Sequence, residues 1–217
     1  MERSQHDAVT AVRAVVFDYG GVIIPPIVDK VARLTERFGV SMPELLEVLL
    51  GPRESGDHPW QRCERGEIGV ADIQGLLEPW ARSAGLSLHG DEIDVLMEPG
   101  YEVLGAMVER IGRLRSAGYR TALLTNTFAE YRETMQQVVP FDNFDVVVES
   151  FAVGARKPEP AIYEATARML AVEHRAILYL DDFDQNLEPA RRLGWQTVHV
   201  TGLAQSLGEL DRLAPLA

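Results

Sequence analysis

Three apolar runs in this chain end in polar side chains that could take part in catalysis. Asp18 follows AVVF, Thr125 and Asn126 follow ALL, and Asp181 and Asp182 follow ILYL. A single acid or amide in such a place is common as the cap of a following helix. Three carboxylates that converge are different, because they repel one another unless a cation neutralises them. Oxygen ligands with no neighbouring His or Cys favour Mg²⁺.

Lys157 is a further candidate, in the segment GARKPEP. Of the 21 basic residues in the chain, Lys30 and Lys157 are the only lysines, and Arg156 stands directly beside Lys157. A chain that uses Arg almost everywhere else hints that a compact ammonium group is needed here. A solvated loop lysine is the alternative interpretation.

The elements that must position these residues follow from the apolar pattern. Five unbroken apolar, β-branched runs predict strands buried on both faces; they cover residues 13–18, 120–125, 145–150, 176–182 and 196–201. Helical stretches alternate with the last four runs, which predicts a parallel, doubly wound α/β sheet. The carboxyl ends of its strands lie along one edge, so the polar residues should converge there.

About a hundred residues separate the first predicted strand from the second, and their pattern is helical. Ser41 and Glu44 fit a capping box at the start of one of these helices. We therefore expect an α/β core made of residues 1–24 and 101–217, with a helical cap at 25–100 inserted into it.

Composition excludes several classes of protein. The 217-residue chain has a net charge of -12 and no basic stripe, which disfavours nucleic acid and anionic lipid as partners. No apolar run approaches the length of a membrane span. The N-terminal MERSQHDAVTAV has no apolar core of a signal peptide, so we expect a cytoplasmic protein. Cys63 is the single cysteine and is expected to be a packed thiol.

Four motifs, in this order, make the chain resemble the haloacid dehalogenase superfamily, whose members are mostly phosphatases. They are FDYGGV at 17–22, LLTN at 123–126, KPEPAIY at 157–163 and LDDFDQNLEPARRLG at 180–194. The resemblance spans about residues 13 to 200 and implies a Rossmann-like sheet with a helical C1 cap inserted after the first motif. The motifs are most similar to those of sugar-phosphate phosphatases and of the phosphatase domain of soluble epoxide hydrolases.

The resemblance also implies roles for single residues. Asp18 would be the nucleophile that attacks phosphorus and forms an aspartyl-phosphate. Mg²⁺ would be held by Asp18, the backbone carbonyl of Gly20 and Asp182. Thr125 and the amide after it would bind phosphoryl oxygens, and Lys157 would pair with both the nucleophile and the phosphate.

Three further polar residues receive less specific roles from the same resemblance. Asn126 and Asn186 would either contact the substrate or support the residues that do. Asp181 would support Lys157 or a metal-bound water. The implied activity is that of a Mg²⁺-dependent phosphatase acting on a small phosphorylated metabolite, as a monomer or homodimer.

One position departs from the family pattern. The residue two after the nucleophile is usually a second Asp, which protonates the leaving oxygen and then activates water, but here it is Gly20. General acid–base help is worth about 10² to 10⁴ in rate, so we expect a slow enzyme. Tyr19 is adjacent, but alternation along an extended segment should turn its side chain away from Asp18.

Two other functions stay open at this point. A phosphate-ligand-binding or regulatory protein would have kept the fold and lost turnover with Gly20. A 2-haloacid dehalogenase would share Asp18 and Lys157, but those enzymes usually carry small or neutral residues where this chain has Asp181 and Asp182.

The cap offers four candidates for substrate contact: His58, Trp60, Arg62 and Arg65. We expect them instead to lie on a solvated helical face.

Overall fold

A computed structural model describes residues 11–52, 56–97 and 103–216. The first ten residues of the N-terminal segment, and the expected core–cap boundary at residue 100, lie outside the described residues. Among those described, no helix combines the length and apolar character needed to cross a bilayer.

Five parallel strands form one sheet in the order β3-β2-β1-β4-β5. The strands are β1 (Ala14–Phe17), β2 (Arg120–Thr125), β3 (Val146–Glu149), β4 (Ile177–Asp181) and β5 (Gln196–His199). β1 lies at the centre of the sheet, where both of its faces are covered. All four of its residues are apolar and fully buried, as this position requires. The parallel α/β fold predicted from the alternating pattern is confirmed.

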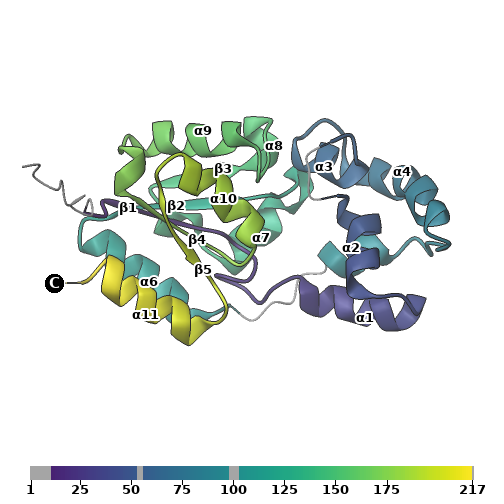
Figure 1. The fold of residues 1–217 in the computed structure, drawn as a ribbon, viewed down its shortest axis with the longest axis horizontal. Coiled ribbons are helices and arrows are strands. Elements are labelled where there is room, and N and C mark those ends of the chain that lie inside the picture. Colours follow the sequence, from purple (N-terminus) through teal and green to yellow (C-terminus); the bar gives the residue numbers. More distant parts are fainter. Residues whose placement is uncertain (1–10, 53–55, 98–102, 217) are drawn as a thin grey trace, which may run out of the picture.

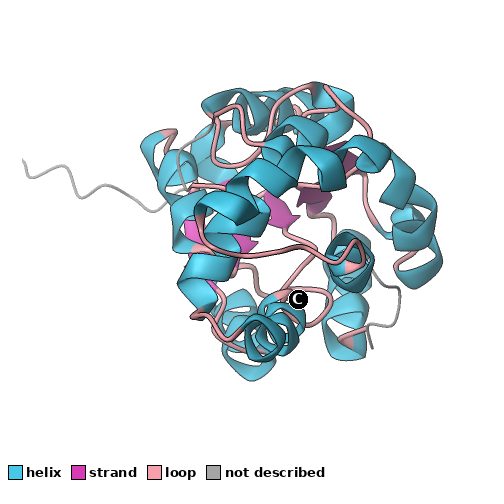
Figure 2. Ribbon diagram, turned by 90° about the vertical axis from the view of Figure 1, so that its right-hand side faces the viewer, coloured by secondary structure: helices cyan, strands magenta, loops and turns pink. Residues whose placement is uncertain are grey.

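Helices cover both faces of this sheet (Figures 1 and 2). Their bounds are α6 (Gly105–Ser116), α7 (Arg132–Val138), α8 (Ser150–Val153), α9 (Pro160–Leu170), α10 (Asp184–Arg192) and α11 (Leu203–Leu213), with short 3₁₀ turns η1 (Ala129–Tyr131), η2 (Phe141–Asn143) and η3 (His174–Ala176). Val15 and Phe17 of β1 pack toward α6, α7 and α11. Ala14 and Val16 pack toward α9 and α10, so alternate residues of β1 serve two cores.

Five of the helices described between β1 and β2 share a third core at one end of the sheet (Figure 1). They are α1 (Val28–Phe38), α2 (Met42–Leu50), α3 (Pro59–Glu64), α4 (Val70–Ser83) and α5 (Glu92–Met97). The capping box predicted at the start of α2 is confirmed: the backbone N–H of Ser41 donates to Glu44 Oε2 at 2.9 Å.

The segment around α3 is fastened to the sheet-bearing part of the molecule by polar contacts and one close backbone approach. Arg65 pairs with Glu159 at 3.3 Å, and the N–H of Val70 donates to Glu130 at 3.1 Å. Gly66 has φ +72°, and a Cβ there would lie 2.7 Å from the carbonyl oxygen of Phe151. Glycine is therefore required at this seam.

Candidate active site

The carboxyl ends of β1 and β4 place two acids side by side. Phe17 lies opposite Leu180 in the parallel register, and the N–H of Asp18 donates to the Leu180 carbonyl at 3.0 Å. Asp18 therefore comes next to Asp181. Both are removed from water, with Asp18 7% exposed and Asp181 fully buried.

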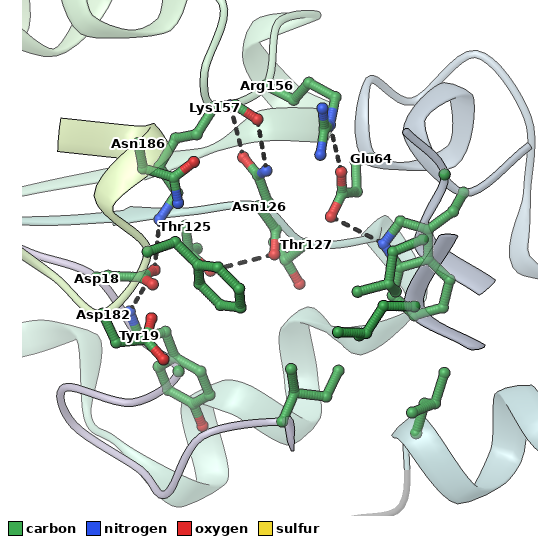
Figure 3. A pocket seen from close by; sticks show the side chains of 18 of the residues that line it. Asp18, Tyr19, Glu64, Thr125, Asn126, Thr127, Arg156, Lys157, Asp182 and Asn186 are labelled. Carbon is green, nitrogen blue, oxygen red and sulfur yellow. Dashed lines mark hydrogen bonds and ion pairs between the residues drawn. The ribbon is translucent and has the colours of Figure 1, made fainter. Parts of the chain in front are cut away.

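Lys157 reaches both acids from the loop that precedes α9. Its Nζ lies 2.7 Å from Asp18 Oδ1 and 2.8 Å from Asp181 Oδ2. The loop is clamped by Asn126, whose Oδ1 accepts from the Lys157 N–H at 2.8 Å and whose Nδ2 donates to the Lys157 carbonyl at 3.0 Å (Figure 3). The side chain of Asn126 thus fixes the backbone of Lys157.

Asp181 accepts more hydrogen bonds than any other group of the site described here. Its Oδ2 accepts from Lys157 and from the hydroxyl of Tyr179. Its Oδ1 accepts from the Phe183 N–H at 2.8 Å, and Nδ2 of Asn186 lies 3.0 and 3.1 Å from the two oxygens. A carboxylate with this many donors is held in one orientation, which fixes the position of the Lys157 ammonium.

Three carboxylates share one ammonium in this cluster. Oxygens of Asp18, Asp181 and Asp182 lie within 4.8 Å of one another. Burial raises the pKa of Asp18 to about 8; Lys157 opposes this rise, while Asp181 and Asp182 add to it. Burial, with Asp181, raises the pKa of Asp182 to about 6. Burial disfavours the charged form of Lys157, but Asp18 and Asp181 raise its pKa above the usual value. The protein alone leaves excess negative charge here.

The carboxylate oxygens that are not used in hydrogen bonds suit a hard divalent cation as ligands. Asp182 Oδ1 is buried and has no hydrogen-bond partner among the described residues. The hydrogen bonds of Asp18 to the Tyr19 N–H and to Lys157 both use Oδ1, at 2.7 Å each. Gly21 makes room for this arrangement, since its φ is +69° and a Cβ would lie 2.1 Å from Asp182 Oδ2. Carboxylate oxygens without donors in a cluster with excess negative charge suit Mg²⁺.

A cavity of about 640 Å³ opens onto this cluster (Figure 3). Asp18, Thr125, Lys157 and Asp182 line its polar end. Away from them the walls are mainly apolar and come from both the sheet edge and the helices between β1 and β2: Ile24, Ile27, Leu46, Leu50, Trp60, Leu96 and Phe128. The cavity therefore has a polar catalytic end, and the rest of its walls are largely apolar.

The expectation of a solvated face for the cap candidates is wrong for two of the four. His58 is 1% exposed and Trp60 is 6% exposed. Trp60 lines the cavity, and its ring meets that of Phe128 edge to face with centroids 4.8 Å apart. Arg62 and Arg65 are partly exposed and pair with Glu67.

The sequence interpretation missed Glu64, Arg156 and Phe128 as cavity residues. Glu64 stands four residues after Trp60 on α3, a spacing that places both on one helix face and could have signalled their pairing. Arg156 and Phe128 lie close in sequence to predicted site residues, but only tertiary packing brings them against Glu64 and Trp60 of α3.

Gly20 lines the cavity without offering an acid. A Cβ at this position would meet no atom within 4 Å, so the first atom of a side chain would have open space here. Tyr19 does not occupy it, because Figure 3 shows its hydroxyl pointing away from the carboxylate of Asp18. The second acid of the family pattern, two residues after the nucleophile, is therefore absent, and Tyr19 does not replace it.

Comparison with known proteins identifies the family. The model of the haloacid dehalogenase-like hydrolases matches residues 12–194. The chain therefore belongs to this family of hydrolases, as the four motifs predicted.

Curated relatives match almost the whole chain. The chain is 30% identical to acyl-CoA dehydrogenase family member 10 of Mus musculus over 97% of its length, which is 20% of that protein. It is 28% identical to bifunctional epoxide hydrolase 2 of Rattus norvegicus over 94% of its length, which is 39% of that protein. The chain thus spans well under half of these two relatives. It is 25% identical to the sesquiterpene phosphatase astK of Aspergillus oryzae over 94% of this chain and 97% of that one.

Solved structures share the fold. A haloacid dehalogenase family enzyme of Bacteroides thetaiotaomicron, bt-2542, in complex with magnesium and inorganic phosphate, has a TM-score of 0.64 and 18% identity. The alignment covers 91% of this chain and 99% of that one. The L-2-haloacid dehalogenase of Xanthobacter autotrophicus, with chloropropionic acid covalently bound, has a TM-score of 0.61 and 17% identity. Its alignment covers 95% of this chain and 84% of that one.

Proposed function

We propose that the protein is a Mg²⁺-dependent phosphatase that hydrolyses phosphate monoesters through a covalent intermediate on Asp18. The observation that carries this proposal is the convergence of three carboxylates and Lys157 at one end of a cavity, with Asp182 Oδ1 buried and without a hydrogen-bond partner in the part of the chain that the structure describes. The likeness to the sesquiterpene phosphatase astK, which covers 97% of that protein, supports it.

Asp18 would attack phosphorus through Oδ2, because Oδ1 is held by the Tyr19 N–H and by Lys157. A bond forms between this oxygen and phosphorus while the ester P–O bond breaks, and its electron pair goes to the leaving oxygen, which takes a proton from water. A second water then attacks phosphorus as the bond between phosphorus and Asp18 Oδ2 breaks, and its proton goes to the hydroxide left by the first water. Phosphate is released and the Asp18 carboxylate is restored.

The other residues of the site would hold the phosphoryl group and the nucleophile. Thr125, which is buried and lines the cavity, would donate to a phosphoryl oxygen, and so would Lys157. Asn126 would position Lys157 through its two hydrogen bonds to the loop backbone. Asp181 would hold the Lys157 ammonium, and Asn186 would hold Asp181.

Asp18, the backbone carbonyl of Gly20 and Asp182 would hold the metal ion. When bound, Mg²⁺ supplies positive charge between the carboxylate and the phosphoryl group. Residues 25–100 would act as a cap over the core formed by 1–24 and 101–217, and would shield the bound substrate from bulk solvent while the reacting water molecules stay in the cavity.

A second candidate is a protein that binds a phosphorylated ligand with little turnover, and Gly20 is the observation that favours it. Without an acid beside the nucleophile the leaving group must find its proton in water, which slows the first step. This candidate predicts Mg²⁺-dependent binding with no release of phosphate above background.

The test is a phosphate-release screen over phosphorylated metabolites with Mg²⁺, with EDTA and with Asp18→Asn. Asp211→Asn is the matched control, because it removes an exposed carboxylate on α11 whose side chain is 64% exposed. We expect activity that EDTA and Asp18→Asn abolish and that the control retains. Activity that survives Asp18→Asn would exclude the covalent mechanism, and halide release from 2-chloropropionate in EDTA would identify a dehalogenase.

A further inference from the structure

We propose that the site prefers phosphate esters of apolar alcohols, such as alkyl monophosphates, over sugar phosphates. This inference rests on the proposed phosphatase function and names the class of substrate for that site. It comes from the walls of the cavity beyond the catalytic residues.

The chamber next to the catalytic end is built from apolar side chains of five separate segments. Ile24 and Ile27 follow β1, Leu46 and Leu50 belong to α2, Trp60 belongs to α3, Leu96 belongs to α5 and Phe128 follows β2. The cavity volume of about 640 Å³ lies in the range of pockets that hold drug-sized ligands, so it has room for an organic group well beyond a phosphoryl group.

The buried polar groups on the cap side of the chamber are almost all engaged with one another. Glu64 is 6% exposed, its Oε1 accepts from the Trp60 indole N–H at 2.9 Å, and its Oε2 accepts from Arg156 Nε at 2.5 Å. The pairing uses both oxygens of Glu64 and neutralises its charge (Figure 3). Trp60 therefore offers its aromatic surface to the chamber, while its N–H is already satisfied.

One buried donor remains on this side. Arg156 Nη1 has no hydrogen-bond partner among the described residues, and Arg156 is 9% exposed and lines the cavity. Glu47, Tyr131 and Gln185 also line the cavity but are exposed or partly exposed, so they need no partner from the substrate. A single donor can meet one acceptor oxygen of a substrate. It cannot meet the several hydroxyls of a sugar, and each hydroxyl buried without a partner weakens binding roughly fivefold to 150-fold.

The test compares kcat/KM for methyl, butyl, hexyl and octyl phosphate with that for glucose 6-phosphate, below the micelle concentration. Each methylene buried in the chamber is expected to raise kcat/KM by up to about fourfold. We expect this rise to continue until the chain fills the cavity, and glucose 6-phosphate to fall below hexyl phosphate. Equal values along the series, or a preference for the sugar phosphate, would overturn the inference.

Leu46→Asp places a charge on the cavity wall and should flatten the dependence on chain length. Leu46 is only half-buried on α2, so the variant is expected to fold. The matched control is Leu76→Asp, because Leu76 is 40% exposed on α4 and does not line the cavity. A Leu46→Asp variant that keeps the full dependence would contradict the proposed placement of the chain.

Binding separates this inference from the proposed function. Calorimetric titration of Asp18→Asn with methyl and octyl phosphate in Mg²⁺ measures affinity without turnover. Tighter binding of octyl phosphate supports the inference even if the wild-type protein releases no phosphate, an outcome that would refute the phosphatase alone. Hydrolysis by the wild type together with equal affinities would refute the inference alone.

Discussion

Replacement of Gly20 with Asp should convert a slow site into a faster one. Gly20 lines the cavity, its φ is not positive, and a Cβ there meets no atom within 4 Å. A Cβ is therefore accommodated at this position without displacement of its neighbours. Gly21 provides the contrast one residue further along, since a Cβ there would lie 2.1 Å from Asp182 Oδ2.

The expected magnitude follows from the chemistry that Gly20 omits. A carboxylic acid at this place would protonate the leaving oxygen and then accept a proton from the attacking water. Such general acid–base help is worth about 10² to 10⁴ in rate, or about 3–5 kcal/mol of barrier. The gain should be large for alkyl phosphates, whose leaving alkoxide needs a proton, and small for p-nitrophenyl phosphate, whose leaving group is stable as an anion.

The assay is steady-state kcat for a series of esters that differ in the pKa of the leaving alcohol. Gly20→Asn is the matched control, because it has the same size as Gly20→Asp without the acid. The aspartate variant should raise kcat and flatten its dependence on leaving-group pKa, whereas the asparagine variant should do neither. A folded Gly20→Asp with wild-type rates and slope would show that this site obtains its proton elsewhere.

Three further predictions concern stability and reactivity. Burial lowers the pKa of His58 to about 4 from 6.5. Between pH 6.5 and 4 the His58 side chain therefore binds a proton in the unfolded chain but not in the folded protein. Urea denaturation should show the unfolding free energy falling by up to about 3 kcal/mol over this pH range. His58→Gln should reduce this loss. Burial raises the pKa of the Cys63 thiol to about 12, so a disulfide reagent should label it slowly in the native protein and fast in urea; equal rates would contradict its burial. Gly66→Ala should lower the unfolding free energy by about 1–3 kcal/mol because of its positive φ and the Phe151 carbonyl, while Gly208→Ala, which meets no atom within 4 Å, should not.

The sheet and its polar edge could be predicted from the sequence because both depend on local pattern. An apolar run that ends in an acid, as at Asp18, places that acid at the carboxyl end of a parallel strand whatever the rest of the chain does. The short supply of lysine drew attention to Lys30 and Lys157, and the position of Lys157 after the third predicted strand placed it near this edge. The convergence of these residues then follows from strand order.

The walls of the cavity could not be predicted in the same way. Trp60 and His58 are polar-tipped residues at the start of a short helix, and the sequence alone predicts a solvated face for them. In the structure Trp60 packs against Phe128 and donates to Glu64, and His58 forms a hydrogen bond with the Val48 carbonyl. Their burial depends on how the helices between β1 and β2 meet the sheet edge. The role of Asn126 as a clamp on the Lys157 backbone likewise depends on a contact across 31 residues of sequence.

The most direct test of the account is the detection of a phosphoryl group on Asp18. Wild-type protein mixed with octyl phosphate and Mg²⁺ would be quenched in acid during turnover, and the peptide that contains residues 14–24 would be weighed by mass spectrometry. The account predicts that this peptide gains the mass of one phosphoryl group, and that EDTA or Asp18→Asn abolishes the gain together with phosphate release. Phosphate release at the same rate from Asp18→Asn, with no phosphorylated peptide from the wild type, would contradict it.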